Sequence, residues 1–237
     1  MLVNRLLDSH SIEPLDFKGN KINFVDNFKL LGVVIDSKLC FDQHIAQLKK
    51  KVYFKGCLIS RVRSIFPFAF RVTLFKLFVV PHFDYSSTVF SFSVSKTRLD
   101  AILKCFHRSL RTSLRYKVSS RLDLGAQLQL LKPLGLLPLK LRWFKRLCFL
   151  VFRSFRNGRP RALLNRYERV NRSREVRGES NRTFLVPRFS LEKYGRVSFL
   201  RITTILLNSF IFQYIFLPND AVSSFTLFLN SNLLKTI

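Results

Sequence analysis

The sequence predicts a mainly α-helical fold preceded by a short β-hairpin. Apolar residues recur at helical intervals over residues 43–63 and again from residue 139 onwards, and this spacing lines one face of a helix. A third segment, Lys96 to Leu114, is a further basic helix. Nearer the N-terminus, polar and apolar residues alternate over residues 21–25, and a period of two is typical of a strand.

A two-residue turn is expected to connect the two strands of the hairpin. Lys21 to Val25 forms the first strand, and Asp26-Asn27 supplies turn-forming residues. Leu30 to Ile35 is an apolar, partly β-branched run that suits a buried strand, with Gly32 marking a bulge or a close backbone approach. Asp36 and Ser37 end this strand. Asp42 is then expected to accept hydrogen bonds from the first N–H groups of a helix.

The first helix is predicted from Gln43 to Arg63. Gly56 lies in its apolar stripe and permits close packing there. The other members of the stripe are Ile45, Leu48, Val52 and Ile59. Lys49 to Lys51 point around the outer surface. Pro67 opens a second helix, through Phe70, Leu74, Leu77 and Phe78, which ends near Pro81, because proline is tolerated in the first turn of a helix and disrupts its interior.

The helix that follows Pro138 separates apolar from charged side chains. On a helical wheel from Leu139, one face carries Trp143, Leu147, Leu150 and Val151. Within an arc of about 100° on the other face lie Arg142, Lys145, Arg146, Arg153 and Arg156, with Phe149 among them. This face contains no acid and is the best local candidate for contact with nucleic acid. An ordinary solvated face is the alternative.

The charge of the whole chain favours a polyanionic partner. Its 237 residues carry a net charge of +27, and 48% of them are hydrophobic, so the chain can bury a core. Between Gln43 and Tyr167 there are 26 Lys and Arg residues against three acids, which places +23 in little more than half of the sequence. Nucleic acid is the commonest partner for such a charge density. A solvated surface, or a sequence that drifts without selection, remains open.

The cysteines indicate a reducing, intracellular environment. Cys40, Cys57, Cys105 and Cys148 lie far apart and form no CxxC pair, so neither a disulfide framework nor a zinc site is indicated. Met1 to Ser9 lacks the apolar core of a signal peptide. We therefore expect free thiols and a nuclear or cytoplasmic location.

One segment raises the question of a membrane. Ile202 to Leu217 is largely apolar but includes Asn208 and Gln213. A membrane-spanning helix needs about 20 apolar residues, more than this segment offers. A buried amphipathic helix is therefore the favoured interpretation, with no membrane partner. A basic membrane-associated protein that uses this segment is the least favoured alternative.

Several segments, in order, resemble reverse transcriptases of non-LTR (LINE-type, jockey-like) retrotransposons. Phe28 to Asp36, with the residues that follow it to Ile45, is similar to the end of the polymerase palm and the start of the thumb. Leu74 to Tyr85 resembles the family's "lyk-lvlPhldY" segment, and Leu134 to Leu139 matches "LGLLPL". Tyr194 to Phe199 resembles "Yg-rSf". The chain departs from the family pattern at three positions. It has Leu30 where the family has tyrosine, and Phe90 and Leu207 where the family has tryptophan.

The resemblance implies polymerase descent without the polymerase site. In the family, clustered aspartates of a [YF]-x-D-D motif hold two divalent ions upstream of the segment that Phe28 begins. No Asp-Asp pair occurs in this chain. We expect no catalytic or metal residue here, no cofactor in the chain itself, and Mg²⁺ only together with the missing palm. Whether the chain has any enzymatic activity is left open.

The implied organisation is a helical, thumb-like bundle that follows a remnant of the palm. The expected parts are residues 1–36 with the hairpin of Ile22 to Ile35, a basic domain over 37–157, a flexible linker over 158–193 and a helical extension over 194–237. The thumb would contact the backbone of RNA, DNA or an RNA–DNA hybrid, and an upstream palm segment is a possible partner. The predicted contact residues are Lys49, Lys50, Lys51, Lys55, Arg61, Arg63, Arg142, Lys145, Arg146, Arg153 and Arg156.

Two further interpretations stay open. The chain could be a non-enzymatic relic of a retroelement, or a domesticated nucleic-acid-binding protein. His82 and Asp84 could suggest a catalytic pair, but no nucleophile is near them in the sequence, and capping at the entry of a helix is favoured.

Overall fold

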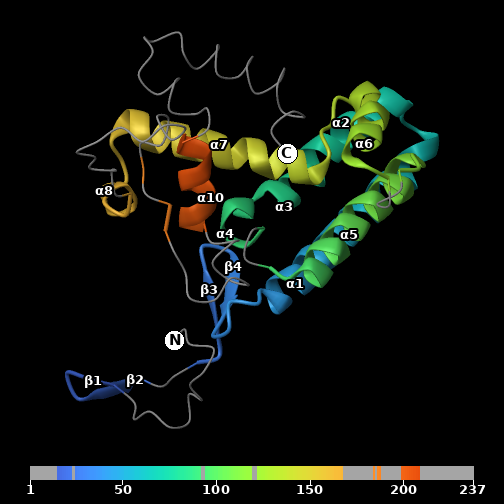
Figure 1. Ribbon diagram of the computed structural model, residues 1–237. Coiled ribbons are helices and arrows are strands. Elements are labelled where there is room, and N and C mark those ends of the chain that lie inside the picture. Colours follow the sequence, from blue (N-terminus) through green and yellow to red (C-terminus); the bar gives the residue numbers. More distant parts are fainter. Residues whose placement is uncertain are drawn as a thin grey trace, which may run out of the picture. The chain divides into compact units, whose positions relative to one another are not determined.

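The computed structural model describes residues 15–22, 25–91, 94–118, 122–167, 184, 186–187 and 199–208 (Figure 1). The fold is mainly helical, as the sequence predicted, and the described residues near the N-terminus form two small antiparallel hairpins where one was expected. The chain divides into two compact units, Met1–Leu136 and Leu137–Ile237. The junction lies inside the range 37–157, for which one domain was expected.

Two hairpins precede the helices. β1 (Leu15–Phe17) pairs antiparallel with β2 (Asn20–Ile22), and β3 (Asn27–Leu30) pairs antiparallel with β4 (Val33–Asp36). In the second hairpin Leu30 faces Val33 across the turn. Both valines of β4 are buried, whereas β3 is exposed along its length.

The predicted turn at Asp26-Asn27 is wrong, because the chain reverses at Leu31-Gly32. The φ angles of Leu31 and Gly32 are 46° and 84°, and a tight hairpin turn of type I′ requires positive φ at both positions. The apolar run from Leu30 to Ile35 is therefore divided between two strands. The Tyr85 hydroxyl donates a hydrogen bond to the Leu31 carbonyl, and its ring packs against Gly32. This long-range contact holds a turn that local preferences do not favour.

Replacing Leu31 with Asn is expected to raise the free energy of unfolding by roughly 0.5–1 kcal/mol, because asparagine tolerates positive φ better than leucine. Leu31 is 83% exposed, so the change removes no buried contact. Urea denaturation measures the effect. Leu30→Asn is the matched control on the neighbouring strand and should bring no gain. A clear loss of stability in Leu31→Asn would contradict the strained turn.

The first long helix agrees with its prediction. α1 (Asp42–Arg61) continues into a short 3₁₀ turn, η2 (Val62–Ser64), and together they cover the expected Gln43 to Arg63. The predicted apolar stripe is buried, and its members are Ile45, Leu48, Val52, Gly56 and Ile59.

α2 (Phe68–Phe78) begins after Pro67, as predicted, but most of its phenylalanines face outwards. Val72 and Phe75 are its buried residues. Its outer side and the adjoining part of α1 border an open apolar hollow of about 370 Å³. We call the exposed apolar residues that line it the aromatic face: Leu58, Phe66, Phe70 and Phe78. Because α2 is apolar on all sides, periodicity could not identify its buried side.

The first unit has an aromatic core that includes Phe75, Phe83 and Phe106. α3 (Val80–Asp84) and α4 (Ser87–Phe90) are short, and α5 (Lys96–Leu114) has the bounds that the sequence predicted. Phe83 and Phe106 meet edge to face with ring centroids 5.3 Å apart. α6 (Leu124–Leu131) and the 3₁₀ turn η3 (Lys132–Leu134) follow. The capping role predicted for His82 and Asp84 is wrong, since no side chain caps α3 and both residues lie inside it.

The second unit is built on α7 (Leu139–Asn157), which starts after Pro138 as expected. Trp143, Leu147 and Val151 are buried, whereas Leu150, predicted on the same face, is 38% exposed. α8 (Arg161–Leu164) occupies part of the range expected to be a flexible linker.

α10 (Phe199–Leu206) is the described part of the predicted helical extension. Tyr167 joins it to the preceding chain, because the Tyr167 hydroxyl lies 2.6 Å from Thr203 Oγ1. The Asn208 side chain bonds both backbone groups of Phe184, at 2.9 and 2.8 Å. The predicted elements at Tyr194 to Ser198 and beyond Asn208 lie outside the described residues. Within those residues, no helix has the length and apolarity needed to cross a membrane.

Candidate nucleic-acid interface

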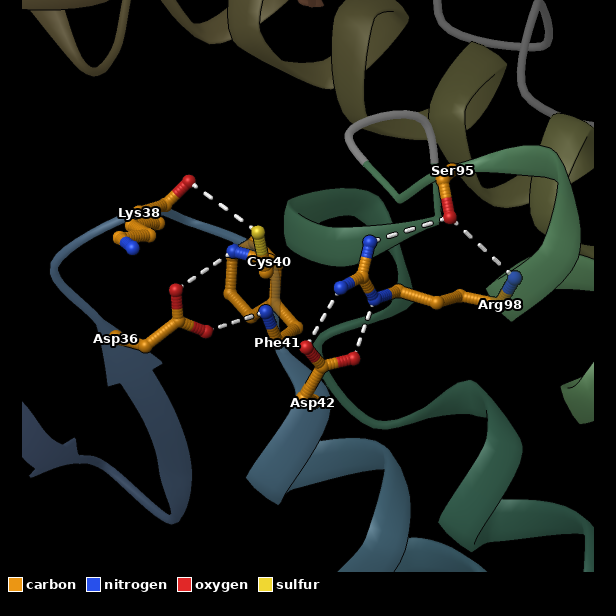
Figure 2. Close-up of polar contacts among 7 residues, drawn as sticks. All are labelled: Asp36, Lys38, Cys40, Phe41, Asp42, Ser95 and Arg98. Carbon is orange, nitrogen blue, oxygen red and sulfur yellow. Dashed lines mark hydrogen bonds and ion pairs between the residues drawn. The ribbon is translucent and has the colours of Figure 1, made fainter. Parts of the chain in front are cut away.

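A polar junction fixes the start of α1 (Figure 2). The Asp36 carboxylate, at the end of β4, accepts hydrogen bonds from the backbone N–H groups of Cys40 at 2.7 Å and Phe41 at 2.5 Å. The predicted capping by Asp42 is therefore wrong. Phe41 occupies the cap position with a φ of 60°, and no side chain caps the helix. Asp36 connects the hairpin to α1, which leaves Asp42 available for another contact.

Asp42 pairs with Arg98 at the start of α5 (Figure 2). The guanidinium donates through Nε to Oδ1 and through Nη2 to Oδ2, the latter at 2.6 Å. Its Nη1 also donates to Ser95 Oγ, at 3.2 Å. This two-pronged geometry sets the N-terminal ends of α1 and α5 side by side. The hydrogen bond from Arg98 lowers the pKa of the Asp42 carboxyl, although partial burial opposes this shift.

We expect the Asp42–Arg98 pair to stabilise the folded protein slightly at neutral pH and not in acid. Since the pKa of Asp42 is lower in the folded protein than its ordinary 3.8, the pair stabilises the fold above that value and loses its effect as the pH falls through the lowered pKa. The pair is exposed, so it contributes less than about 1 kcal/mol. Urea unfolding of Asp42→Asn should show a deficit near neutral pH that vanishes in acid. A deficit of equal size under both conditions would count against the pair.

The middle of α1 packs closely on α5 through small residues. The Ser113 hydroxyl donates to the Gly56 carbonyl at 3.5 Å, and both residues are buried. A β-carbon on Gly56 would lie 3.2 Å from Ser113 Oγ, so a side chain at this position must displace the serine hydroxyl. Gly56 therefore sets the distance between the two helices.

Gly56→Leu is expected to reduce the free energy of unfolding by about 2 kcal/mol or more, because it forces the two helices apart. Gly56→Ala is the matched control. Its gain in helix propensity, roughly 0.5–1 kcal/mol, offsets the displacement of Ser113, so its net effect should be small. Denaturant unfolding compares the two variants. Equal stability of both would show that the helices tolerate separation.

A basic groove lies between α1 and α5. It is an open hollow of about 520 Å³ whose lining includes Lys49 and Tyr53 from α1 and Lys104 and Arg108 from α5. The three cations are exposed, and Tyr53 is 58% exposed. Cys105 also lines the groove. Burial raises the pKa of its thiol, while the charges of Lys49 and Arg108 oppose the increase. Both cations therefore lie close enough to influence the same thiol.

Lys104 and Arg108 were not among the predicted contact residues. Their spacing of four places them on one face of α5, and this was visible in the sequence. The sequence did not show which face of α5 packs against α1, because this packing is a tertiary contact between distant segments.

The residues predicted on α1 do not form one surface. Lys49 borders the groove, whereas Lys51 lines a small pocket with His44 and His82. Lys50 is exposed and points in a direction different from those of Lys49 and Lys51. The Lys55 ammonium lies 5.8 Å from the ring centroid of Phe78, beside the aromatic face. The two remaining residues, at the end of α1 and in η2, are exposed: Arg61 and Arg63.

The five cations predicted on α7 do share one side of that helix. Arg146 and Arg153 are exposed, whereas Arg142, Lys145 and Arg156 are half-buried. The Arg156 guanidinium lies 5.9 Å from the ring centroid of Phe152. Burial, followed by the charge of Arg142, lowers the pKa of Lys145. This cationic arc belongs to the second unit and is a further candidate surface.

We found no match to this chain among models of protein families, among curated proteins or among solved structures.

The described residues do not form a two-metal site. No three His, Cys, Asp or Glu side chains in this part of the chain come together as metal ligands would. The cysteines are unpaired by disulfides, and Cys148 is buried, which raises the pKa of its thiol to about 12. The groove and the cationic arc offer cations and aromatic rings, which can interact with anions and with planar groups.

Proposed function

We propose that this chain is a thumb-type fragment of a non-LTR retrotransposon reverse transcriptase that binds the sugar–phosphate backbone of a template–primer duplex. The order of the sequence motifs supports the descent. The basic groove between α1 and α5 supports the binding, and it is the observation on which the proposal depends. RNA, DNA or a hybrid of the two fits this chemistry.

The chemistry of the groove suits a phosphate backbone. Lys49, Lys104 and Arg108 approach one hollow from two helices, so a strand laid along it meets cations on both sides. Lysine and arginine contacts to phosphates give affinity without reading the bases. The exposed ring of Tyr53 adds a surface on which a base or a sugar can stack. The groove therefore supports binding that depends on salt and tolerates any sequence.

The binding test compares wild-type protein with the triple variant Lys49→Gln, Lys104→Gln and Arg108→Gln. Fluorescence anisotropy with a labelled RNA–DNA hybrid is measured over a salt series. We expect weaker binding, and a slope of log affinity against log salt that is smaller by about 2–3, because each lost phosphate contact removes roughly 0.7–0.9 from it.

The matched control removes the same charge elsewhere in the first unit, at exposed residues on β3, α2 and η3: Lys29, Lys76 and Lys132. Its slope should change less than that of the groove variant. If both triple variants bind alike, the protein responds only to net charge, and the groove is not the binding surface. Absence of binding at low salt would leave the non-enzymatic relic as the better account.

The cationic arc on α7 is tested separately. A variant with Gln at Arg142, Lys145, Arg146 and Arg153 removes four of its five charges. If the arc and the groove contact different phosphates independently, the losses in binding free energy caused by the two variants should add when the variants are combined. A quadruple variant that binds as well as wild type would restrict the interface to the first unit.

A further inference from the structure

A second, smaller pocket lies on the other side of α1 from the basic groove. It has a volume of about 80 Å³ and is lined by the turn of the β3–β4 hairpin, by α1 and by α3 with the residue after it. Its polar lining consists of His44, Gln47, Lys51, His82 and Tyr85. Lys49 and Lys51 point to different sides of α1, because successive helix residues are about 100° apart. The two hollows are therefore distinct.

His44, which lines the pocket, has a buried polar atom without a protein partner. Its side chain is buried, with 8% exposure, and its Nε2 makes no hydrogen bond. The ring meets Phe90 edge-on at 5.2 Å, and this contact fixes the ring without satisfying the nitrogen. Most buried polar atoms have a hydrogen-bond partner. Since His44 lines the pocket, a ligand or water there can provide the missing one.

The charges around the pocket select an anion rather than a metal ion. α1 brings the ammonium groups of Lys51 and, further along, Lys55, and the hairpin turn contributes Gly32 and no charge. From α3, Asp84 is buried and is not part of the lining. Burial and the charge of Lys51 lower the pKa of both His44 and His82, and Lys55 adds to the effect at His82. The positive potential that disfavours imidazolium here would also repel a metal cation.

The donors present can surround a small oxyanion. The Tyr85 hydroxyl donates to the Leu31 carbonyl, so it does not count among the donors to the pocket. Gln47 and Lys51 offer N–H groups from one face of α1, and the two imidazoles can each donate one more. Such a set is matched to the oxygens of a tetrahedral anion. The volume is too small for a nucleoside base.

We propose that the pocket formed by His44, Gln47, Lys51 and His82 binds a single phosphate group, from a nucleic-acid end or as a free ion. The bound anion accepts from Lys51 and Gln47 and completes the hydrogen bonding of His44. Bound negative charge favours imidazolium, so phosphate binding and protonation of His44 support each other. This inference does not rest on the proposed function, because its test needs no duplex.

The test follows the histidine ring signals of the full chain by NMR over a pH range of about 5.5 to 8. Sulfate at constant ionic strength is the first probe, because its charge does not change over this range. We expect sulfate to raise the pKa of His44 by roughly 1, since a new opposite charge close to an ionisable group has an effect of this order. His107, buried in α5, is an internal reference that should not respond.

Two substitutions locate the effect. Lys51→Gln should abolish the sulfate response of His44, while Lys50→Gln, the exposed neighbour with the same charge, should keep it. Both positions are exposed, so neither variant is expected to disturb folding. His44→Gln identifies the signal. An unchanged pKa of His44, or an equal response in Lys51→Gln, would overturn the proposal.

A final comparison distinguishes the sources of phosphate. Short oligonucleotides with a 5′-phosphate or a 5′-hydroxyl replace sulfate in the same titration. A response to the phosphorylated form that exceeds the response to sulfate assigns the pocket to a nucleic-acid end, and an equal or stronger response to sulfate assigns it to a free anion. If neither sulfate nor the phosphorylated oligonucleotide shifts His44, no phosphate binds. Duplex affinity in the groove assay is independent of each of these results.

Discussion

The close approach of α1 and α5 is the constraint on which the first unit depends. Gly56 and Ser113 set the separation in the middle of the pair, and Asp42 and Arg98 align the ends across 56 residues of sequence. Lys49 and the α5 cations line the hollow between these two helices, so the separation of the helices sets its width. The contact at Gly56 therefore contributes to the geometry of the charged surface.

The long helices were predictable, because each carries its own signal. α5 has the expected bounds, and the apolar stripe of α1 is buried as its spacing required. The hairpin was not predictable by the same rules. Local turn chemistry favours Asp26-Asn27 over Leu31-Gly32, since leucine is disfavoured at positive φ. The contact that decides otherwise comes from Tyr85, 54 residues further along the chain.

The candidate site was predicted in part, and the reason lies in the pairing of helices. A helical wheel assigns Lys49, Lys50 and Lys51 to different directions, but it does not show what lies in each direction. Lys49 lies beside α5, and Lys51 lies beside the β3–β4 turn and α3. Lys50 faces solvent. The roles of Lys104 and His82 depend on these neighbours. Sequence patterns therefore supplied the charged residues, and only the fold grouped them.

Because the aromatic face is exposed, the net charge of +27 also affects whether copies of the protein associate in solution. Like-charged copies repel one another, and this keeps their exposed phenylalanines apart. The repulsion reaches about 10 Å in 0.1 M salt and only about 3 Å in 1 M salt. A polyanion that neutralises the cations removes the same barrier. Added salt, or any polyanion that neutralises the cations, therefore lowers the electrostatic barrier that separates the aromatic faces of two copies.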